Sequence, residues 1–93
     1  MWEIYEHRRV ARQLSRLPTE ILKRYEKWKD VVGISGPAAL RLIKGFHDET
    51  LRGEWLGHRS SRLGLQYRVI YRVANRQCEV LVIDITAHDY RKK

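Results

Sequence analysis

The sequence contains a single cysteine, Cys78. One cysteine excludes an intramolecular disulfide and a cysteine-based zinc cluster, so we expect the chain to work in the cytoplasm. The chain also lacks a run of about 20 apolar residues, the length that a membrane-spanning helix requires. Its first ten residues lack the apolar segment of a signal peptide. We therefore expect neither membrane insertion nor secretion.

Three kinds of catalytic site are also missing from the sequence. The four histidines, His7, His47, His58 and His88, do not have the spacing of metal ligands. No glycine-rich phosphate loop precedes a predicted helix, and no serine or cysteine lies in a nucleophile motif. The sequence therefore predicts a protein without a metal, a cofactor or a nucleophilic side chain of its own.

Acidic residues are scarce relative to basic ones. Nineteen Lys and Arg against eleven Asp and Glu give a formal net charge of +8 on 93 residues. Most of the basic residues are arginines, whose planar guanidinium binds phosphate with two hydrogen bonds. This charge favours a polyanion or an acidic protein as partner over a basic surface that serves solubility alone. The length fits one domain, which we expect to span residues 1–93.

Helical periodicity is confined to the first half of the chain. Apolar residues at spacings of three and four predict a helix over 8–17, with arginines on its outer face, and a second helix over 18–32. Gly33 is a plausible C-cap for the second helix. Residues 38–43 predict a short third helix or a continuation of the second.

Strand patterns surround these helices. We expect strands over 2–5, 54–60, 65–73 and 78–85, with a loop over 44–53 and turns over 61–64 and 74–77. The last strand is apolar on both faces and should be central in the sheet. The expected fold class is α+β, ordered β-α-α-β-β-β, with a helical hairpin on one face of a mostly antiparallel sheet.

Alternation along 65–73 separates two sets of side chains. Leu65, Tyr67, Val69, Tyr71 and Val73 share one face, and Gln66, Arg68 and Arg72 share the other. Because the helices cover one face of the sheet, we expect the arginines on the face that the helices leave free.

Three segments carry a resemblance to a known family. Leu51-Arg52-Gly53 is followed by residues 66–71 (Gln-Tyr-Arg-Val-Ile-Tyr) and then by the apolar residues 80–83, which lead to His88. This pattern resembles the RelE/ParE superfamily of toxins, and it spans nearly the whole chain. The resemblance implies ribosome-dependent cleavage of messenger RNA and a cognate antitoxin protein.

The resemblance also implies roles for particular residues. Arg68 matches the strand arginine that holds the scissile phosphate, in agreement with its place in the alternation. His88 follows the last strand, where relatives such as YoeB, HigB and YafQ have a histidine, and an imidazole is suited to proton transfer at neutral pH. Tyr90, close behind it, is a candidate for base stacking or proton handling. Arg59 falls where RelE has a lysine, and we include it with the catalytic candidates.

Further residues are candidates for RNA binding: Arg52, His58, Arg62 and Arg72. Ser61 stands where RelE has a second catalytic lysine, so the proton-transfer scheme of RelE does not carry over. His58 is one substitute for the missing base. Glu49 or Asp48 in the preceding loop is another, as in YoeB.

Together these observations predict a toxin of a type II toxin–antitoxin system that cuts mRNA, at the ribosome, without a metal. The RNA 2′-hydroxyl would attack the adjacent phosphorus, with Arg68 stabilising the developing charge. One alternative is a ParE-like module that inhibits DNA gyrase by binding. Another is an inactive toxin homologue that acts only with its antitoxin.

Overall fold

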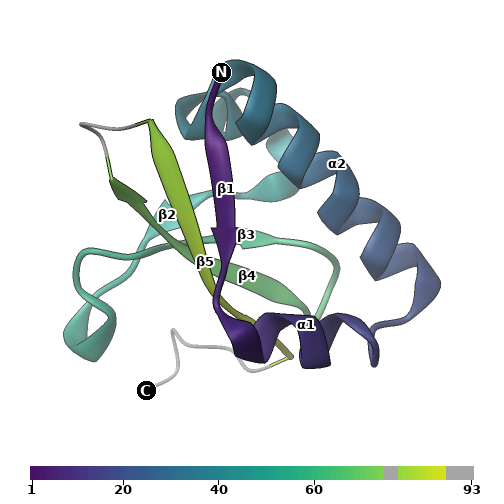
Figure 1. The fold of residues 1–93 in the computed structure, drawn as a ribbon. Coiled ribbons are helices and arrows are strands. Elements are labelled where there is room, and N and C mark those ends of the chain that lie inside the picture. Colours follow the sequence, from purple (N-terminus) through teal and green to yellow (C-terminus); the bar gives the residue numbers. More distant parts are fainter. Residues whose placement is uncertain (75–77, 88–93) are drawn as a thin grey trace.

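A computed structural model describes residues 1–74 and 78–87. Its helices and strands follow one another as shown in Figure 1: β1 (Glu3–Glu6), α1 (Arg8–Leu14), α2 (Thr19–Ser35), β2 (Glu49–Thr50), β3 (Arg59–Arg62), β4 (Arg68–Ala74) and β5 (Glu79–Thr86). The described part of the chain also contains three short 3-10 helices, at Pro37–Leu42, Lys44–Phe46 and Gly53–Trp55.

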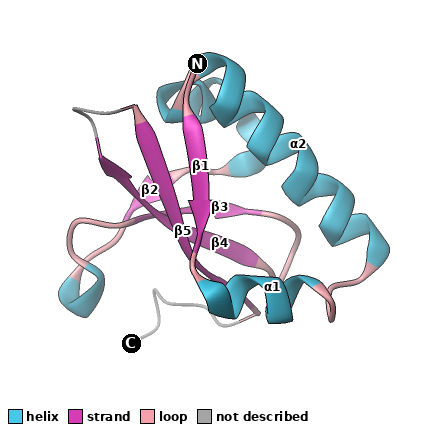
Figure 2. Cartoon of the chain, in the orientation of Figure 1, coloured by secondary structure: helices cyan, strands magenta, loops and turns pink. Residues whose placement is uncertain are grey.

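The strands form one sheet in the order β1-β5-β4-β3-β2. β1 runs parallel to β5, and the other neighbours are antiparallel. Figure 2 shows this sheet with the two helices packed beside it. The expected α+β class, the mostly antiparallel sheet and the interior position of the last strand are confirmed. The two-residue strand β2, within the segment expected to be a loop, is an addition.

Each helix buries part of the apolar set that its periodicity selected, and the first helix, expected over 8–17, ends at Leu14. α1 buries Val10, and α2 buries Tyr25, Trp28 and Val32. They pack with Val69, Tyr71, Val80 and Val82 of the sheet in one core, at the centre of which Trp28 lies edge-on to Tyr71 with 5.2 Å between ring centroids. The main contacts of α1 are with β5 and β1, so the expected hairpin is held by the sheet more than by contact between its helices.

The prediction that α2 ends at Gly33 is wrong. The helix continues to Ser35, and its cap is Gly36, which has a φ of 88° and donates its backbone N–H to Val32. A positive φ of this size favours glycine, because glycine has no Cβ that would clash in this conformation. Gly33 instead lies inside the helix, where its carbonyl accepts a hydrogen bond from the N–H of Trp2.

The strand expected over 54–60 is also misplaced. Gly53 and Gly57 have φ values of 67° and 89°, and residues between them form a 3-10 turn. The strand starts only at Arg59 and includes Ser61 and Arg62, which were assigned to a turn. Consequently the connection to β4 is formed by residues 63–67, so Leu65 and Tyr67 precede the strand.

The alternation expected along β4 is confirmed from Arg68 onward. Val69 and Tyr71 belong to the core beneath the helices, so Arg68, Ile70 and Arg72 lie on the opposite face of the sheet, which we call the far face. Register extends this assignment to β3, because Ser60 pairs with Ile70 and Arg62 pairs with Arg68.

Candidate active site around Arg68

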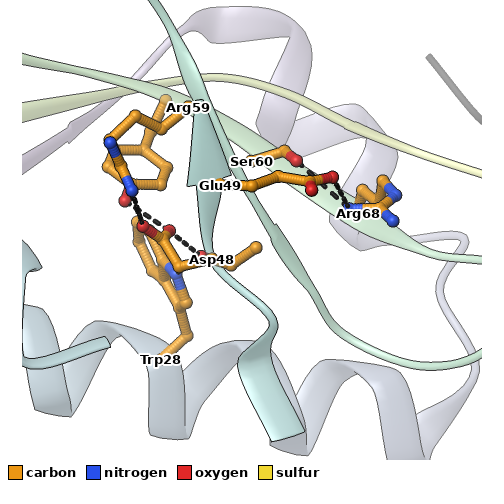
Figure 3. Close-up of polar contacts among 8 residues, drawn as sticks. Trp28, Asp48, Glu49, Arg59, Ser60 and Arg68 are labelled. Atoms are coloured by element: carbon orange, nitrogen blue, oxygen red, sulfur yellow. Dashed lines mark hydrogen bonds and ion pairs between the residues drawn. The ribbon is translucent and has the colours of Figure 1, made fainter. Parts of the chain in front are cut away.

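Arg68 is held by side chains from two neighbouring strands. Its Nη1 lies 3.3 Å from Oε2 of Glu49 in β2 and 3.2 Å from Oγ of Ser60 in β3. Only 5% of Arg68 is exposed, so the guanidinium has a fixed position, whereas the Glu49 side chain is 30% exposed. Figure 3 shows the three side chains converging. The sequence predicts the position of Arg68 on the far face, but it does not predict the burial of its side chain there.

Strand pairing explains why these residues meet. Glu49 pairs with Ser60, and Arg68 pairs with both Arg62 of β3 and Thr86 of β5. The site therefore lies where β2, β3, β4 and β5 come together. A cation beside a partly exposed carboxylate can stabilise negative charge on a substrate while the carboxylate accepts a proton.

A second polar cluster lies on the helix side of the same strands. The Asp48 side chain is fully buried and accepts hydrogen bonds from Nε of Arg59 at 2.8 Å, Oγ of Ser61 at 2.7 Å and the hydroxyl of Tyr71 at 2.5 Å. Trp28 donates its indole N–H to Ser61 at 3.0 Å. We call these five residues the Asp48 cluster; Figure 3 shows Asp48, Arg59 and Trp28 apart from Arg68.

The Asp48 cluster fixes the chain just before the site. Asp48 and Glu49 are adjacent, but one reaches into the core beneath the helices and the other reaches Arg68 on the far face. Burial and the neighbouring Asp48 carboxylate both raise the pKa of Tyr71, which keeps its hydroxyl protonated as a donor. β2 has only two residues, so these buried bonds to Asp48 hold Glu49 where backbone pairing alone would be weak.

Arg59 is not brought together with Arg68. Its register partner is Tyr71, which lies in the helix-side core, and both Nε and Nη2 bind the Asp48 carboxylate, Nη2 at 2.7 Å. Its side chain is 20% exposed. The structure therefore gives Arg59 a role in holding Asp48, and its placement among phosphate-binding groups finds no geometric support.

The RNA-binding candidates are placed at different distances from Arg68. Arg62 is half-buried directly beside Arg68, and Arg72 is exposed on the same face, four residues further along β4. Arg52 is exposed just before a 3-10 turn. His58 is half-buried, packs edge-on against Trp55, and has its Nδ1 3.4 Å from the carbonyl oxygen of Leu56.

His88 and Tyr90 lie outside the described residues, so their predicted roles stay predictions. Glu49, which the sequence offered only as one of several alternative bases, is the carboxylate found at Arg68. The contribution of Ser60 was not foreseen, because the strand that carries it was misplaced. The pairing of β2 with β3 and of β3 with β4 brings Glu49 and Ser60 to Arg68, and the sequence alone does not reveal this pairing.

In the part of the chain that the structure describes, no group of three or more His, Cys, Asp or Glu is arranged to hold a metal ion. Among the same residues, no helix has the length and apolar character needed to cross a membrane.

Comparison with known proteins identifies the fold. No family model and no curated protein sequence matches the chain significantly. Solved structures do match it. RelE in the RelE–RelB complex of Pyrococcus horikoshii is 24% identical, with 91% of this chain and 92% of that chain covered and a TM-score of 0.73.

Two further toxins show the same architecture at lower identity. The YoeB–YefM complex of Staphylococcus aureus matches with 14% identity, 96% and 99% coverage and a TM-score of 0.72. YafQ of Escherichia coli matches with 13% identity, 92% coverage of each chain and a TM-score of 0.68. The chain therefore has the fold of the RelE, YoeB and YafQ toxins, and the expected resemblance to the RelE/ParE superfamily is confirmed for the fold.

Proposed function

We propose that this protein is the toxin of a toxin–antitoxin pair and that it cuts messenger RNA at the ribosome, in the cytoplasm, without a metal. The observation that carries the proposal is the buried Arg68 on the far face, with Glu49 and Ser60 fixing its guanidinium. The shared fold with RelE, YoeB and YafQ supports it.

The chemistry requires no nucleophile from the protein. The RNA 2′-hydroxyl attacks the adjacent phosphorus, the bond from phosphorus to the 5′-oxygen breaks, and a 2′,3′-cyclic phosphate and a 5′-hydroxyl remain. Arg68 is suited to stabilise the charge that grows on the phosphoryl oxygens, because an arginine fork matches phosphate geometry.

The two proton transfers need a base and an acid. Glu49 is the better base of these two adjacent carboxylates, since Asp48 is fully buried and already accepts three hydrogen bonds, whereas Glu49 remains partly exposed beside Arg68. We assign proton donation to the leaving 5′-oxygen to His88, from its imidazole chemistry and its resemblance to relatives. Arg62 and Arg72 then contact flanking phosphates, and Tyr90 stacks on a base.

A cognate antitoxin protein completes the proposal. Two of the matching structures are complexes, one of RelE with RelB and one of YoeB with YefM. We infer that an antitoxin, encoded with this chain, binds it and prevents cleavage.

The direct test incubates purified protein with ribosomes programmed with a defined mRNA. Primer extension maps the cut, and end-group analysis identifies the termini. The proposal predicts a discrete cut with a 5′-hydroxyl on the downstream product. Growth arrest by an intact protein that leaves mRNA uncut and inhibits DNA gyrase would instead support the ParE-like alternative.

Removal of divalent metal should leave the chemical step unchanged. The test uses the slow background cleavage of a ribosome-free RNA oligonucleotide by excess protein, because EDTA would itself dissociate ribosomes. Since the proposed charge stabilisation comes from Arg68 and the nucleophile comes from the RNA, this background cleavage is expected to proceed at the same rate in EDTA. The measurement is a single-turnover time course with and without chelator. Cleavage that stops in EDTA and returns with Mg²⁺ or Mn²⁺ would contradict the scheme.

A further inference from the structure

The outer surface of α1 carries a concentration of positive charge that the proposed cleavage site does not use. Arg8, Arg9 and Arg12 on the helix and Arg16 in the turn after it are all exposed. We call these four residues the α1 arginine surface. The segment 7–18 contains no acidic residue. None of the four arginines forms an ion pair with another described residue.

The second helix shows that this arrangement is specific to α1. On α2 the exposed lysines Lys23 and Lys27 alternate with Glu20, Glu26 and Asp30, which is the mixed pattern of an ordinary solvated helix face. On α1, in contrast, four like charges lie within about 12 Å of helix and turn, and their mutual repulsion is relieved by a bound anion.

The arginines also surround a hollow. Arg9, Arg12, Gln13 and Arg16 line a depression of about 190 Å³ on the surface. Among its polar groups, Nε of Arg9 donates to Nδ1 of His7 at 3.2 Å. The Gln13 amide donates to Asp84 and accepts the N–H of Ile85, so the hollow presents no acceptor of Gln13 to repel an anion. The aliphatic stems of the arginines form most of the surface of this hollow, and their guanidinium groups, which bind phosphate oxygens, extend from its edge.

The position of α1 connects this surface to the cleavage site. Gln13 binds both Asp84 and the N–H of Ile85 in β5, and the next residue, Thr86, pairs with Arg68. Figure 1 shows α1 lying against this end of β5. The α1 arginine surface and Arg68 therefore lie at the same end of the sheet but on opposite faces, so a polyanion that contacts both must extend around that end.

From these observations we propose that the α1 arginine surface binds the phosphate backbone of double-helical RNA, separately from the strand that is cut. The inference rests on the proposed function and extends it with a second RNA contact. Single-stranded RNA is bound largely by stacking on aromatic side chains, and residues 8–17 contain none. Duplex RNA is recognised by its shape and its phosphates, for which exposed arginines are sufficient.

An acidic protein is the competing occupant, and the surface fits it less well. Protein interfaces depend on apolar or aromatic anchors at their centre. The large apolar side chains that the described structure exposes are Met1, Tyr5, Ile34, Leu42, Leu56 and Leu65, and none belongs to the α1 arginine surface.

The test compares two variants that lose the same charge at exposed helical or turn positions. Arg12→Gln/Arg16→Gln changes the α1 arginine surface, and Lys23→Gln/Lys27→Gln is the matched control on α2. Each is titrated with a labelled 20-base-pair RNA duplex, with a single-stranded RNA of the same length and with polyglutamate, at several salt concentrations. The duplex assay detects binding alone, so its result does not depend on whether the protein cuts RNA.

The α1 variant is expected to bind the duplex more weakly than the control, with the slope of log K against log salt reduced by roughly one to two units, because each lost phosphate contact releases about one counterion fewer. Single-stranded RNA binding should change equally little in both. Equal weakening of duplex binding in both variants would overturn the proposal, because it would show that duplex affinity depends only on the net charge of the protein. Loss of polyglutamate binding with unchanged duplex binding would assign the surface to an acidic protein.

Discussion

Replacing Arg68 with alanine is expected to slow single-turnover RNA cleavage by roughly 10²–10³-fold, the usual effect of removing one strong donor to a developing oxyanion. RNA affinity should fall much less, because the interaction with Arg68 strengthens only as charge accumulates in the transition state. The buried guanidinium, fixed by Glu49 and Ser60, is already oriented before substrate arrives, which is the condition for such an effect. The measurement is the cleavage rate at saturating protein, beside an independent binding titration.

Two controls separate this effect from charge and from folding. Arg41→Ala removes the same charge from an exposed position outside the site and should leave the cleavage rate near that of the wild type. Arg68→Lys keeps the charge but loses the planar fork, so it should recover only part of the rate. Thermal melts show whether each variant is folded. A folded Arg68→Ala protein that cleaves at the wild-type rate would show that the site lies elsewhere.

Replacing Asp48 with asparagine is expected to lower the free energy of unfolding by roughly 3 kcal/mol, the lower part of the range for breaking a buried ion pair. The substitution leaves the guanidinium of Arg59 without its counter-charge. It also replaces one carboxylate oxygen, an acceptor, by an amide NH₂ group, a donor. That NH₂ group faces either the hydroxyls of Ser61 and Tyr71 or the guanidinium of Arg59. We expect a loss in the lower part of that range because 20% of the Arg59 side chain is exposed to solvent. Urea denaturation measures the change.

Asp30→Asn makes the same chemical change at an exposed position of α2 and should be nearly neutral. The double variant Asp48→Asn/Arg59→Gln removes both charges and should regain part of the lost stability, since no unpaired buried charge remains. An Asp48→Asn protein as stable as Asp30→Asn would mean that the Asp48 cluster does not hold the fold together.

Local periodicity was enough to predict the helices and the face of Arg68. The alternation along β4 depends on the two-residue repeat of a strand, and the core residues of α2 follow from helical spacing. Both signals lie within one segment of chain. They remain valid whatever the segment packs against, which is why the far face of β4 could be assigned without a structure.

The failures concern positions that depend on distant segments. The predicted start of β3 lies five residues before the observed one, because the turn formed around Gly53 and Gly57 comes first. Without the register of this strand, the faces of its side chains could not be assigned. Arg59 faces Asp48 on the helix side because it pairs with Tyr71. Nor did sequence alone place Glu49 beside Arg68, because the two belong to strands that pair only through β3.

The central claim is that the RNA itself supplies the nucleophile at the Arg68 site. It is tested most directly by programming ribosomes with an mRNA that carries a single 2′-deoxynucleotide immediately 5′ of the mapped cut. The account predicts that the all-ribose mRNA is cut to give a 5′-hydroxyl end and that the deoxy mRNA is not cut at that bond, although it occupies the ribosome equally. Cleavage of the deoxy mRNA at the same bond would contradict the account.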